Sequence, residues 1–430
     1  MSVLVRRLAL AALLAVVACD DGTTDPGEGG GAYVQPPVPS PTLVGRGDLV
    51  SATPAAANTR QEVALVLAAT GFTSAFTARH DTRAFVVRYR TPGVDGQLTT
   101  ASGIVWVPVG ATGALPVVTY MHGTVTNKQL SPSFLSPLES RIGAAYASDG
   151  WVAILPDYLG LGVAGEGTYH PYLHLQTQSS AAIDLLRATR TLLRQQNLTA
   201  DWRTLTVTGY SQGGGVAMGL FRELERNFAS DFPVMAAAPA SGPYDLEGTG
   251  RALIEQDPAY VNSVVYTLYL AEAMRRVYQL APTAGAFFLP PSDVAATAVV
   301  EGAFTPQLAA SLPARPRGVL QPDVLAAMQA QRDHPLWRAL RDNTAYDWTP
   351  RAPLRMYYGG ADRDVFPQNA LTAEARMRAN GARNVAAVNL GAALDHPGAT
   401  LPSVLATKLF ADSVRRTLAP AVTLARAAGF

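Results

Sequence analysis

The chain has little cysteine, little charge and no apolar run long enough to cross a membrane. Cys19 is the only cysteine among 430 residues, which excludes a disulfide framework within the chain, so stability has to come from a packed core. Charged residues make up 16% of the chain and the formal net charge is +1, which gives no electrostatic basis for binding nucleic acid. Hydrophobic residues nevertheless make up 48%, enough for one large α/β domain with an insertion or for two domains.

An N-terminal targeting segment precedes the folded part of the chain. Arg6 and Arg7 form a short basic region and an apolar run from Leu8 to Ala18 follows, which together indicate a signal peptide over residues 1–18. The residues Val16-Val17-Ala18-Cys19 resemble a bacterial lipobox, in which the cysteine is lipidated and becomes the new N-terminus. We therefore expect a protein of the bacterial cell envelope, anchored to a membrane by a lipid on Cys19. If the lipobox is not used, the segment is an ordinary secretory signal and the protein is secreted.

Residues 19–45 have the composition of a disordered, lipidated tether. Acidic residues and glycines dominate from Asp20 to Gly31, and they cannot bury apolar surface. Prolines between Pro36 and Pro41 favour an extended polyproline II conformation. Such a segment suits a spacer between an anchor and a folded body, which we expect from residue 46 onward.

Short apolar strands alternate with helical patterns in the folded part. Two strands, Arg83 to Arg90 and Leu98 to Pro108, form a predicted antiparallel pair around a turn rich in proline and glycine. Further strands are predicted at 115–120, 151–155, 205–208, 234–238, 354–358 and 385–390, with helices between them such as 181–195 and 369–380. This order indicates an α/β fold with a mainly parallel sheet flanked by helices on both faces.

The alternation breaks between residues 246 and 348. Apolar residues recur there at helical spacing, as in 261–280, 324–328 and 336–340. A helical insertion therefore divides the core into a first part, 46–245, and a second part, 349–430. An insertion at this point lies over the carboxyl edge of the sheet, so we interpret it as a lid or cap. The alternative is a helical layer that only packs.

The residues Gly209-Tyr210-Ser211-Gln212-Gly213 spell the G-x-S-x-G pattern of a nucleophile elbow. A strand signal, Leu205 to Thr208, precedes them and a helical pattern, Val216 to Phe221, follows. Glycine at both flanks lets strand and helix pass close to the strained turn. We therefore predict that Ser211 is a nucleophile; the alternative is a glycine-rich turn with a bystander serine.

A serine nucleophile needs a base and an orienting carboxylate, and after an elbow the acid precedes the histidine in the chain. His334 and His396 follow the serine, and His396 lies in the loop after the last core strand, where a base has to be. The loop after the preceding strand holds Asp362 and Asp364. We favour Asp362, which is nearer the sheet edge, and keep Asp364 as the alternative acid. No set of histidine or glutamate ligands accompanies the two aspartates, so no metal is expected.

Acyl transfer also needs hydrogen-bond donors for the developing oxyanion. The backbone N–H of Gln212, directly after the nucleophile, is the first candidate. The second is the N–H of Thr124, with its hydroxyl as a candidate helper, because Gly123 lets that loop turn close to a substrate. His122 precedes the serine in the chain, which favours a structural hydrogen bond over a role as base.

Two neighbouring stretches receive no chemical role from the sequence. The loop Pro156-Asp157-Tyr158-Leu159-Gly160-Leu161-Gly162 follows a core strand, and we interpret it as a wall of the site. His170-Pro171-Tyr172 and His174 continue that loop and are assigned as structural groups.

Together these motifs resemble the α/β-hydrolase superfamily, and more narrowly its secretory-lipase and bacterial lipoprotein esterase branch with a helical lid. The resemblance covers about residues 50–425. It implies an α/β-hydrolase fold and a serine hydrolase that cleaves carboxylic esters, small or lipid-like, with the triad Ser211, Asp362 and His396 and without a cofactor. The disulfides of some fungal secretory lipases are absent.

Two other functions stay open. A serine peptidase of the prolyl-oligopeptidase type normally carries a β-propeller, and no run of short strands here could form one. A non-catalytic binding lipoprotein on a hydrolase scaffold usually lacks a member of the triad, whereas this sequence fills all three positions.

Overall fold

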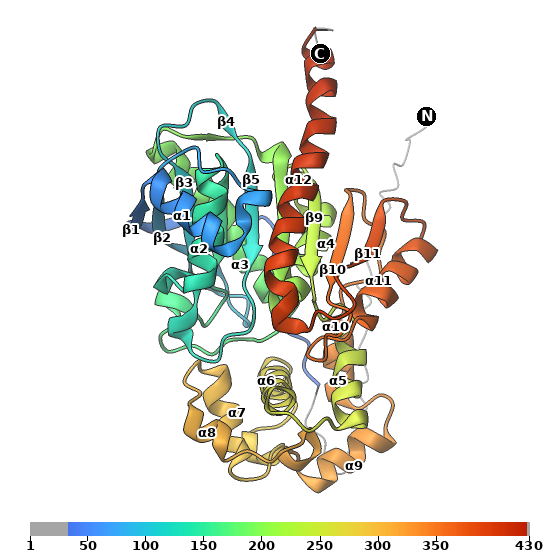
Figure 1. The fold of residues 1–430 in the computed structure, drawn as a ribbon. Helices are drawn as coiled ribbons and strands as arrows, with labels where there is room; N and C mark the ends of the chain where they lie inside the picture. Colours follow the sequence, from blue (N-terminus) through green and yellow to red (C-terminus); the bar gives the residue numbers. More distant parts are fainter. Residues whose placement is uncertain (1–32, 428–430) are drawn as a thin grey trace, which may run out of the picture. The chain divides into compact units, whose positions relative to one another are not determined.

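The computed structural model describes residues 33–427 (Figure 1). The expected signal peptide, residues 1–18, and the expected lipidation site, Cys19, lie outside the described residues. No helix in the described part is long and apolar enough to span a membrane.

Within residues 33–427 the main sheet has nine strands in the order β1-β2-β3-β6-β5-β8-β9-β10-β11. Their bounds are β1 (Leu49–Asn58), β2 (Thr82–Pro92), β3 (Leu98–Pro108), β5 (Val117–Met121), β6 (Val152–Pro156), β8 (Leu205–Tyr210), β9 (Val234–Ala240), β10 (Leu354–Tyr358) and β11 (Val385–Asn389). The first three strands pair antiparallel, as does β3 with β6, and every pairing from β6 to β11 is parallel. The predicted mainly parallel sheet is therefore confirmed. A small second sheet pairs β4 (Ala114–Leu115) with β7 (Thr199–Ala200).

Helices cover both faces of the sheet, and the strand period of two divides the buried side chains between them. On β5, for example, Val117 packs into one apolar cluster and Val118 into the other. The first cluster lies under α3 (Leu175–Gln195), α4 (Gln212–Asn227) and α11 (Gln368–Ala379). The second lies under α1 (Arg60–Thr70), α2 (Pro137–Ser148) and α12 (His396–Ala427).

The segment between β9 and β10 is helical, as its periodicity predicts. Its helices are α5 (Leu246–Gln256), α6 (Val261–Val277), α7 (Ser292–Val300), α8 (Pro306–Ala310), α9 (Pro322–Ala330) and α10 (Pro335–Asp342). They enclose an apolar cluster of their own, which also takes in Tyr172 and Leu173 from the core. We refer to residues 246–348 as the helical insertion.

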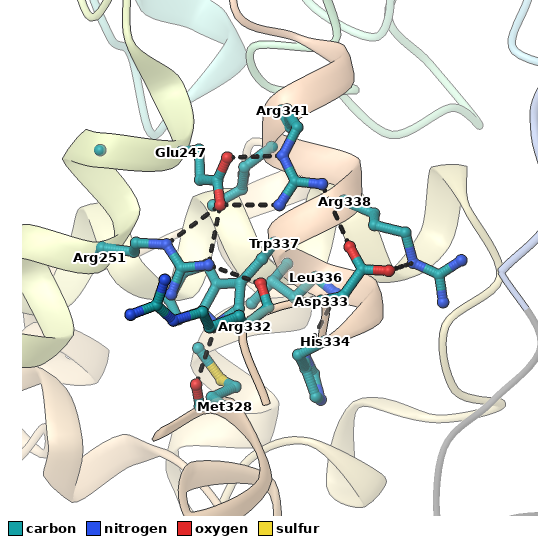
Figure 2. Close-up of polar contacts among 12 residues, drawn as sticks. Glu247, Arg251, Met328, Arg332, Asp333, His334, Leu336, Trp337, Arg338 and Arg341 are labelled. Atoms are coloured by element: carbon teal, nitrogen blue, oxygen red, sulfur yellow. Dashed lines mark hydrogen bonds and ion pairs between the residues drawn. The ribbon is translucent and has the colours of Figure 1, made fainter. Parts of the chain in front are cut away.

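A polar cluster joins the first and last helices of the insertion (Figure 2). Glu247 of α5 accepts hydrogen bonds from Arg251 at 2.8 Å and from Arg341 of α10 at 2.8 Å. Arg341 also pairs with Asp333 at 3.1 Å, just before α10. The Arg341 guanidinium lowers the pKa of Glu247 below its usual range, because it stabilises the ionised carboxylate.

Residues 33–48, the N-terminal strap, lie on the folded body, although the sequence places 33–45 in the disordered tether. The Val34 N–H donates to the carbonyl of Tyr278 in the insertion at 2.9 Å, and the ring of Tyr33 stacks on that of Tyr278. At its other end the Arg46 guanidinium forms a buried pair with Asp184 of α3 at 3.1 Å. The strap has no regular secondary structure over residues 33–40 and turns at 41–42 and 44–47, and its backbone finds partners on the surface that it crosses.

The sequence analysis did not predict strand β1. The strand is poor in strong strand formers and contains Pro54, but it lies at the sheet edge, where a proline removes no bond from an inner ladder. Two register shifts, one of them beside Pro54, accommodate it against β2.

Candidate active site

Ser211 lies at the turn between β8 and α4 in a strained backbone conformation. Its φ of 60° and ψ of −123° fall outside the regions that non-glycine residues normally adopt. A Cβ on Gly213 would lie 2.0 Å from the carbonyl oxygen of Met121, and one on Gly209 would lie 2.4 Å from that of Gly213. The two glycines are therefore required by the close approach of β5, β8 and α4, as the elbow pattern predicts.

Three side chains from separate parts of the chain meet at this turn. The Nε2 atom of His396 lies 2.8 Å from Ser211 Oγ, and its Nδ1 atom lies 2.7 Å from Asp362 Oδ2. With a proton on Nδ1 donated to the carboxylate, Nε2 is left to accept the hydroxyl proton of the serine. Each of the three residues is mostly buried, since 8% of Ser211, 3% of Asp362 and 8% of His396 are exposed.

The loop after β10 fixes which aspartate faces the histidine. Asp362 Oδ1 accepts the backbone N–H of Asp364 at 3.0 Å and that of Val365 at 2.9 Å, which leaves Oδ2 for His396. Asp364 points to the insertion instead, where its carboxylate accepts from Asn262 and Tyr266 of α6, each at 3.3 Å. The structure therefore brings Asp362, and not Asp364, against His396.

The two predicted oxyanion donors lie on adjoining segments. Gln212 is the first residue of α4, so its N–H has no partner within the helix. A Cβ on Gly123 would lie 3.8 Å from Ser211 Cβ, which places the loop of Thr124 beside the nucleophile. The Thr124 Oγ1 atom lies 2.8 Å from the Tyr172 hydroxyl.

His170 is held in the neutral form beside the elbow. Its Nδ1–H donates to the carbonyl of Leu159 at 2.8 Å, and its Nε2 accepts from the side-chain amide of Gln212 at 2.8 Å. Burial lowers the pKa of His170 to about 3, because the charged ring would be desolvated. The ring of His122 lies between two carbonyl oxygens, that of Gly123 at 2.7 Å and that of Asp157 at 3.1 Å. Both rings therefore form hydrogen bonds with loop carbonyl groups, which agrees with the structural role that the sequence favours.

The loop 156–162 does not line the pocket at Ser211. Asp157 is buried behind His122, where its carboxylate accepts from the Ser102 hydroxyl at 2.6 Å and the Ser133 N–H at 2.8 Å. Burial raises the pKa of Asp157, because ionisation is disfavoured away from water. The wall predicted here is formed instead by Tyr172 and Leu173, further along the same segment.

A narrow, mainly apolar pocket of about 30 Å³ opens onto the nucleophile. Core loops and the insertion share its lining, which comprises Tyr172, Leu173, Ser211, Gln212, Pro243, Leu246, Thr249, Leu253, Tyr266, Leu270, Asp364 and Val365. Leu253 and Leu270 also line a second apolar cavity of about 20 Å³ inside the insertion, next to Met328 and Trp337. Leu253 and Leu270 therefore lie between the pocket at Ser211 and the second cavity.

The sequence gives no signal that Tyr172, Tyr266 and Leu270 belong to the pocket. Tyr172 lies in a loop read as structural, and the other two lie on a helix whose apolar residues mostly pack inside the insertion. Only the contact between α6 and the core brings them to the nucleophile. The helical spacing of Tyr266 and Leu270, four residues apart, shows that they share a face but not what that face covers.

Solved structures similar to this chain include hydrolases. A presumed hydrolase from Legionella pneumophila shares 27% identity over 86% of this chain and 98% of its own, with a TM-score of 0.79. The rice cell wall degrading esterase LipA from Xanthomonas oryzae shares 28% identity over 87% of this chain and 99% of its own, with a TM-score of 0.75. Candida antarctica lipase A, at 15% identity over 82% of this chain and 78% of its own, has a TM-score of 0.59 and matches in fold.

No family model matches the sequence, and the search of curated proteins found no match. The fold is therefore recognised from structure. The elbow after β8, the mixed sheet with helices on both faces and the hydrolases with the same fold agree with one another. The chain belongs to the α/β-hydrolase superfamily.

Proposed function

We propose that this protein hydrolyses carboxylic esters through an acyl-enzyme on Ser211. The observation that carries the proposal is the unbroken hydrogen-bonded series from Ser211 Oγ through His396 to Asp362 at the elbow. A serine hydroxyl is a weak nucleophile at neutral pH, and this series supplies the base and the orienting carboxylate that it needs. The similarity to a LipA esterase over 99% of that chain supports the same chemistry.

In the proposed reaction His396 Nε2 takes the proton of Ser211 as Oγ bonds to the ester carbonyl carbon. The carbonyl electron pair moves to its oxygen, which the N–H groups of Gln212 and Thr124 stabilise. The tetrahedral intermediate then collapses, and His396 gives its proton to the departing alkoxide, which leaves as the alcohol. Water repeats the sequence on the acyl-enzyme, with His396 as its base, and releases the acid and Ser211.

The mainly apolar lining of the pocket at Ser211 supports a substrate with a hydrophobic chain. The lining side chains Leu253 and Leu270 lie on two helices of the insertion, and both also line the second cavity, next to Trp337. In this proposal the insertion acts as the cap of the site, because α5 and α6 supply one wall of the pocket. Because the pocket is small, we further propose that α5 or α6 shifts when an ester binds and so acts as a lid.

The two alternatives remain distinguishable from the lead proposal. A peptidase of the prolyl-oligopeptidase type would cleave a peptide bond after proline, and a non-catalytic binding lipoprotein would react with neither ester nor peptide. We also propose that a lipid on Cys19 anchors the enzyme to a membrane of the cell envelope. If Cys19 is not modified, the enzyme is secreted.

A fluorophosphonate probe and a panel of p-nitrophenyl esters of graded chain length test the function. We expect wild type to be labelled and to hydrolyse esters, and Ser211→Ala to lose labelling and to lose activity by several orders of magnitude while staying folded. A proline-containing peptide substrate gives the comparison for a peptidase. Ester hydrolysis that survives in a folded Ser211→Ala variant would refute the proposal, and so would a wild type that resists the probe.

A further inference from the structure

The hydroxyl of Thr124 has one hydrogen-bond partner in the described part of the chain, the hydroxyl of Tyr172 at 2.8 Å. Tyr172 lines the same pocket as Ser211 and Gln212. The residue before Thr124 is Gly123, whose Cβ position would lie 3.8 Å from Ser211 Cβ. The threonine hydroxyl therefore contacts a residue of the pocket lining, and it lies on the loop that carries one of the two proposed oxyanion donors.

The direction of this hydrogen bond follows from burial. Tyr172 is 4% exposed, and burial raises the pKa of its phenol well above the usual range, so the phenol keeps its proton. If Thr124 donated, the phenol proton would be left in the pocket without an acceptor, which costs about 1–3 kcal/mol for a buried donor. If Tyr172 donates, both protons are used once a substrate oxygen accepts from the Thr124 hydroxyl.

The ring of Tyr172 is fixed by the helical insertion. It stacks on Tyr269 of α6 with centroids 4.1 Å apart and an angle of 13° between the planes, and it meets the edge of His170. The Tyr269 hydroxyl also donates to the carbonyl of Val125 at 3.2 Å, directly after Thr124. Helix α6 therefore contacts the loop of Thr124 both directly and through Tyr172.

We propose that the Thr124 hydroxyl is a third donor to the oxyanion and that Tyr172 is the positioning residue that aims and polarises it. This inference rests on the proposed ester hydrolysis. As negative charge develops on the substrate oxygen, the Thr124 O–H donates to it, and the Tyr172 O–H donates to Thr124 Oγ1. A donor that itself accepts a hydrogen bond is strengthened, so the pair stabilises the transition state more than the neutral ester.

Removal of the hydroxyl with little change of shape tests the role of Thr124. Thr124→Val keeps the backbone N–H, and we expect kcat for a short p-nitrophenyl ester to fall by about 100-fold with KM nearly unchanged, the lower end of the loss for one oxyanion donor. A trifluoromethyl ketone, which forms a tetrahedral adduct on the serine, should lose affinity by a similar factor. Thr124→Ser, which restores a hydroxyl, should recover most of kcat.

A double-mutant cycle tests the role of Tyr172. Tyr172→Phe should lower kcat by about 3- to 10-fold in wild type but have no further effect in Thr124→Val, because no hydroxyl is left to aim. Tyr278→Phe is the matched control. It removes a buried phenol that accepts from Asn343 at 2.7 Å just past the end of α6, so it reports on loss of stability alone, and its kcat should be unchanged.

Three outcomes would overturn the inference. The first is a kcat for Thr124→Val within about twofold of wild type. The second is that Tyr172→Phe lowers kcat by the same factor in wild type and in Thr124→Val. The third is a higher KM for Thr124→Val with an unchanged kcat, which would show that Thr124 binds the ground-state substrate and not the transition state. If Thr124→Val does not fold, Thr124→Ala replaces it in the kinetics and in the double-mutant cycle, and the same criteria apply. A wild type without esterase activity would instead refute the proposed function.

Discussion

His396 Nδ1 lies 2.7 Å from Asp362 Oδ2, while Asp364, two residues further along the same loop, faces Asn262 and Tyr266 of the insertion. The loop therefore gives its two carboxylates to different partners. One orients the ring beside the nucleophile, and the other connects the loop to α6.

This division predicts unequal effects of two isosteric substitutions. Asp362→Asn should lower kcat by about a thousandfold or more, because the neutral amide neither fixes the histidine tautomer nor stabilises its charged form. Asp364→Asn should stay within about tenfold of wild type and act mainly on KM, since Asp364 lines the pocket. Steady-state kinetics on one ester compares the two, and the reverse order would assign the acid to Asp364.

The close approach at the elbow predicts that Gly213 cannot be replaced. A Cβ there would meet the backbone oxygens of Met121 and His122 at 2.0 and 2.6 Å, so Gly213→Ala must displace the oxyanion loop and should abolish activity or folding. Gly219→Ala in the same helix is the control, because its Cβ would meet only the side chain of Leu175 at 3.3 Å. Activity and thermal unfolding of both variants check this; an active Gly213→Ala would contradict the packing described above.

Buried neutral histidines predict a loss of stability in acid. Burial lowers the pKa of His170 to about 3 and that of His174 to about 4, whereas an unfolded histidine titrates near 6.5. Below about pH 6.5 the unfolded state binds protons that the folded state does not. The free energy of unfolding therefore decreases as the pH is lowered, until the pH reaches the pKa of the histidine in the folded state. Each histidine costs about 2 kcal/mol by pH 5 on this basis.

Urea unfolding at pH 7 and pH 5 measures the effect. His174→Asn should lose less stability than wild type between the two pH values, because one titrating group is gone and asparagine still suits the position before α3. The comparison of two proteins cancels the contributions of the carboxylates. Equal losses in wild type and variant would show that His174 does not stay neutral in the folded protein.

The N-terminal strap predicts where the chain can be shortened. A protein that begins at Tyr33 should keep wild-type stability, since it retains the contacts with Tyr278 and Asp342. A protein that begins at Val44 loses them, together with the bond from Arg46 to the Ser40 carbonyl, and should be less stable by about 2–4 kcal/mol at roughly 1 kcal/mol per hydrogen bond. Denaturant unfolding of the two proteins compares them, and equal midpoints would show that the strap contributes nothing.

The resemblance of residues 16–19 to a lipobox predicts that Cys19 carries a membrane anchor. The full-length protein expressed in a bacterium should partition into the detergent phase, because two or three acyl chains suffice for stable anchoring. Cys19→Ala should be recovered without lipid and with unchanged kcat. A soluble, unacylated wild type in a host that processes lipoproteins would refute the anchor and leave the proposed hydrolase chemistry intact.

Most of the sheet could be predicted because its inner strands are short apolar runs. The predicted strand at Leu354–Tyr358 has the bounds of β10, and the serine turn was recognisable from its glycines. Strand β1 lacked such a signal, since alanines and a proline at an edge depend on pairing with β2 more than on their own propensity.

The candidate site was predictable only as far as chain order and sheet topology decide it. Both aspartates follow the same strand, so the pattern alone could rank Asp362 and Asp364 but not separate them. Tyr172 was missed because its contacts with Thr124 and Tyr269 join three distant segments, and no local pattern records them.

His396 is the first residue of α12, and it lies 185 positions after Ser211 with the whole insertion between them. During synthesis the nucleophile therefore emerges long before its base and its carboxylate. A nascent chain that has been made only as far as α10 lacks both Asp362 and His396, so it has no base for Ser211. Under the proposed mechanism, the reaction begins only when the last helix docks on the sheet, so completion of the fold is itself the step that turns the enzyme on.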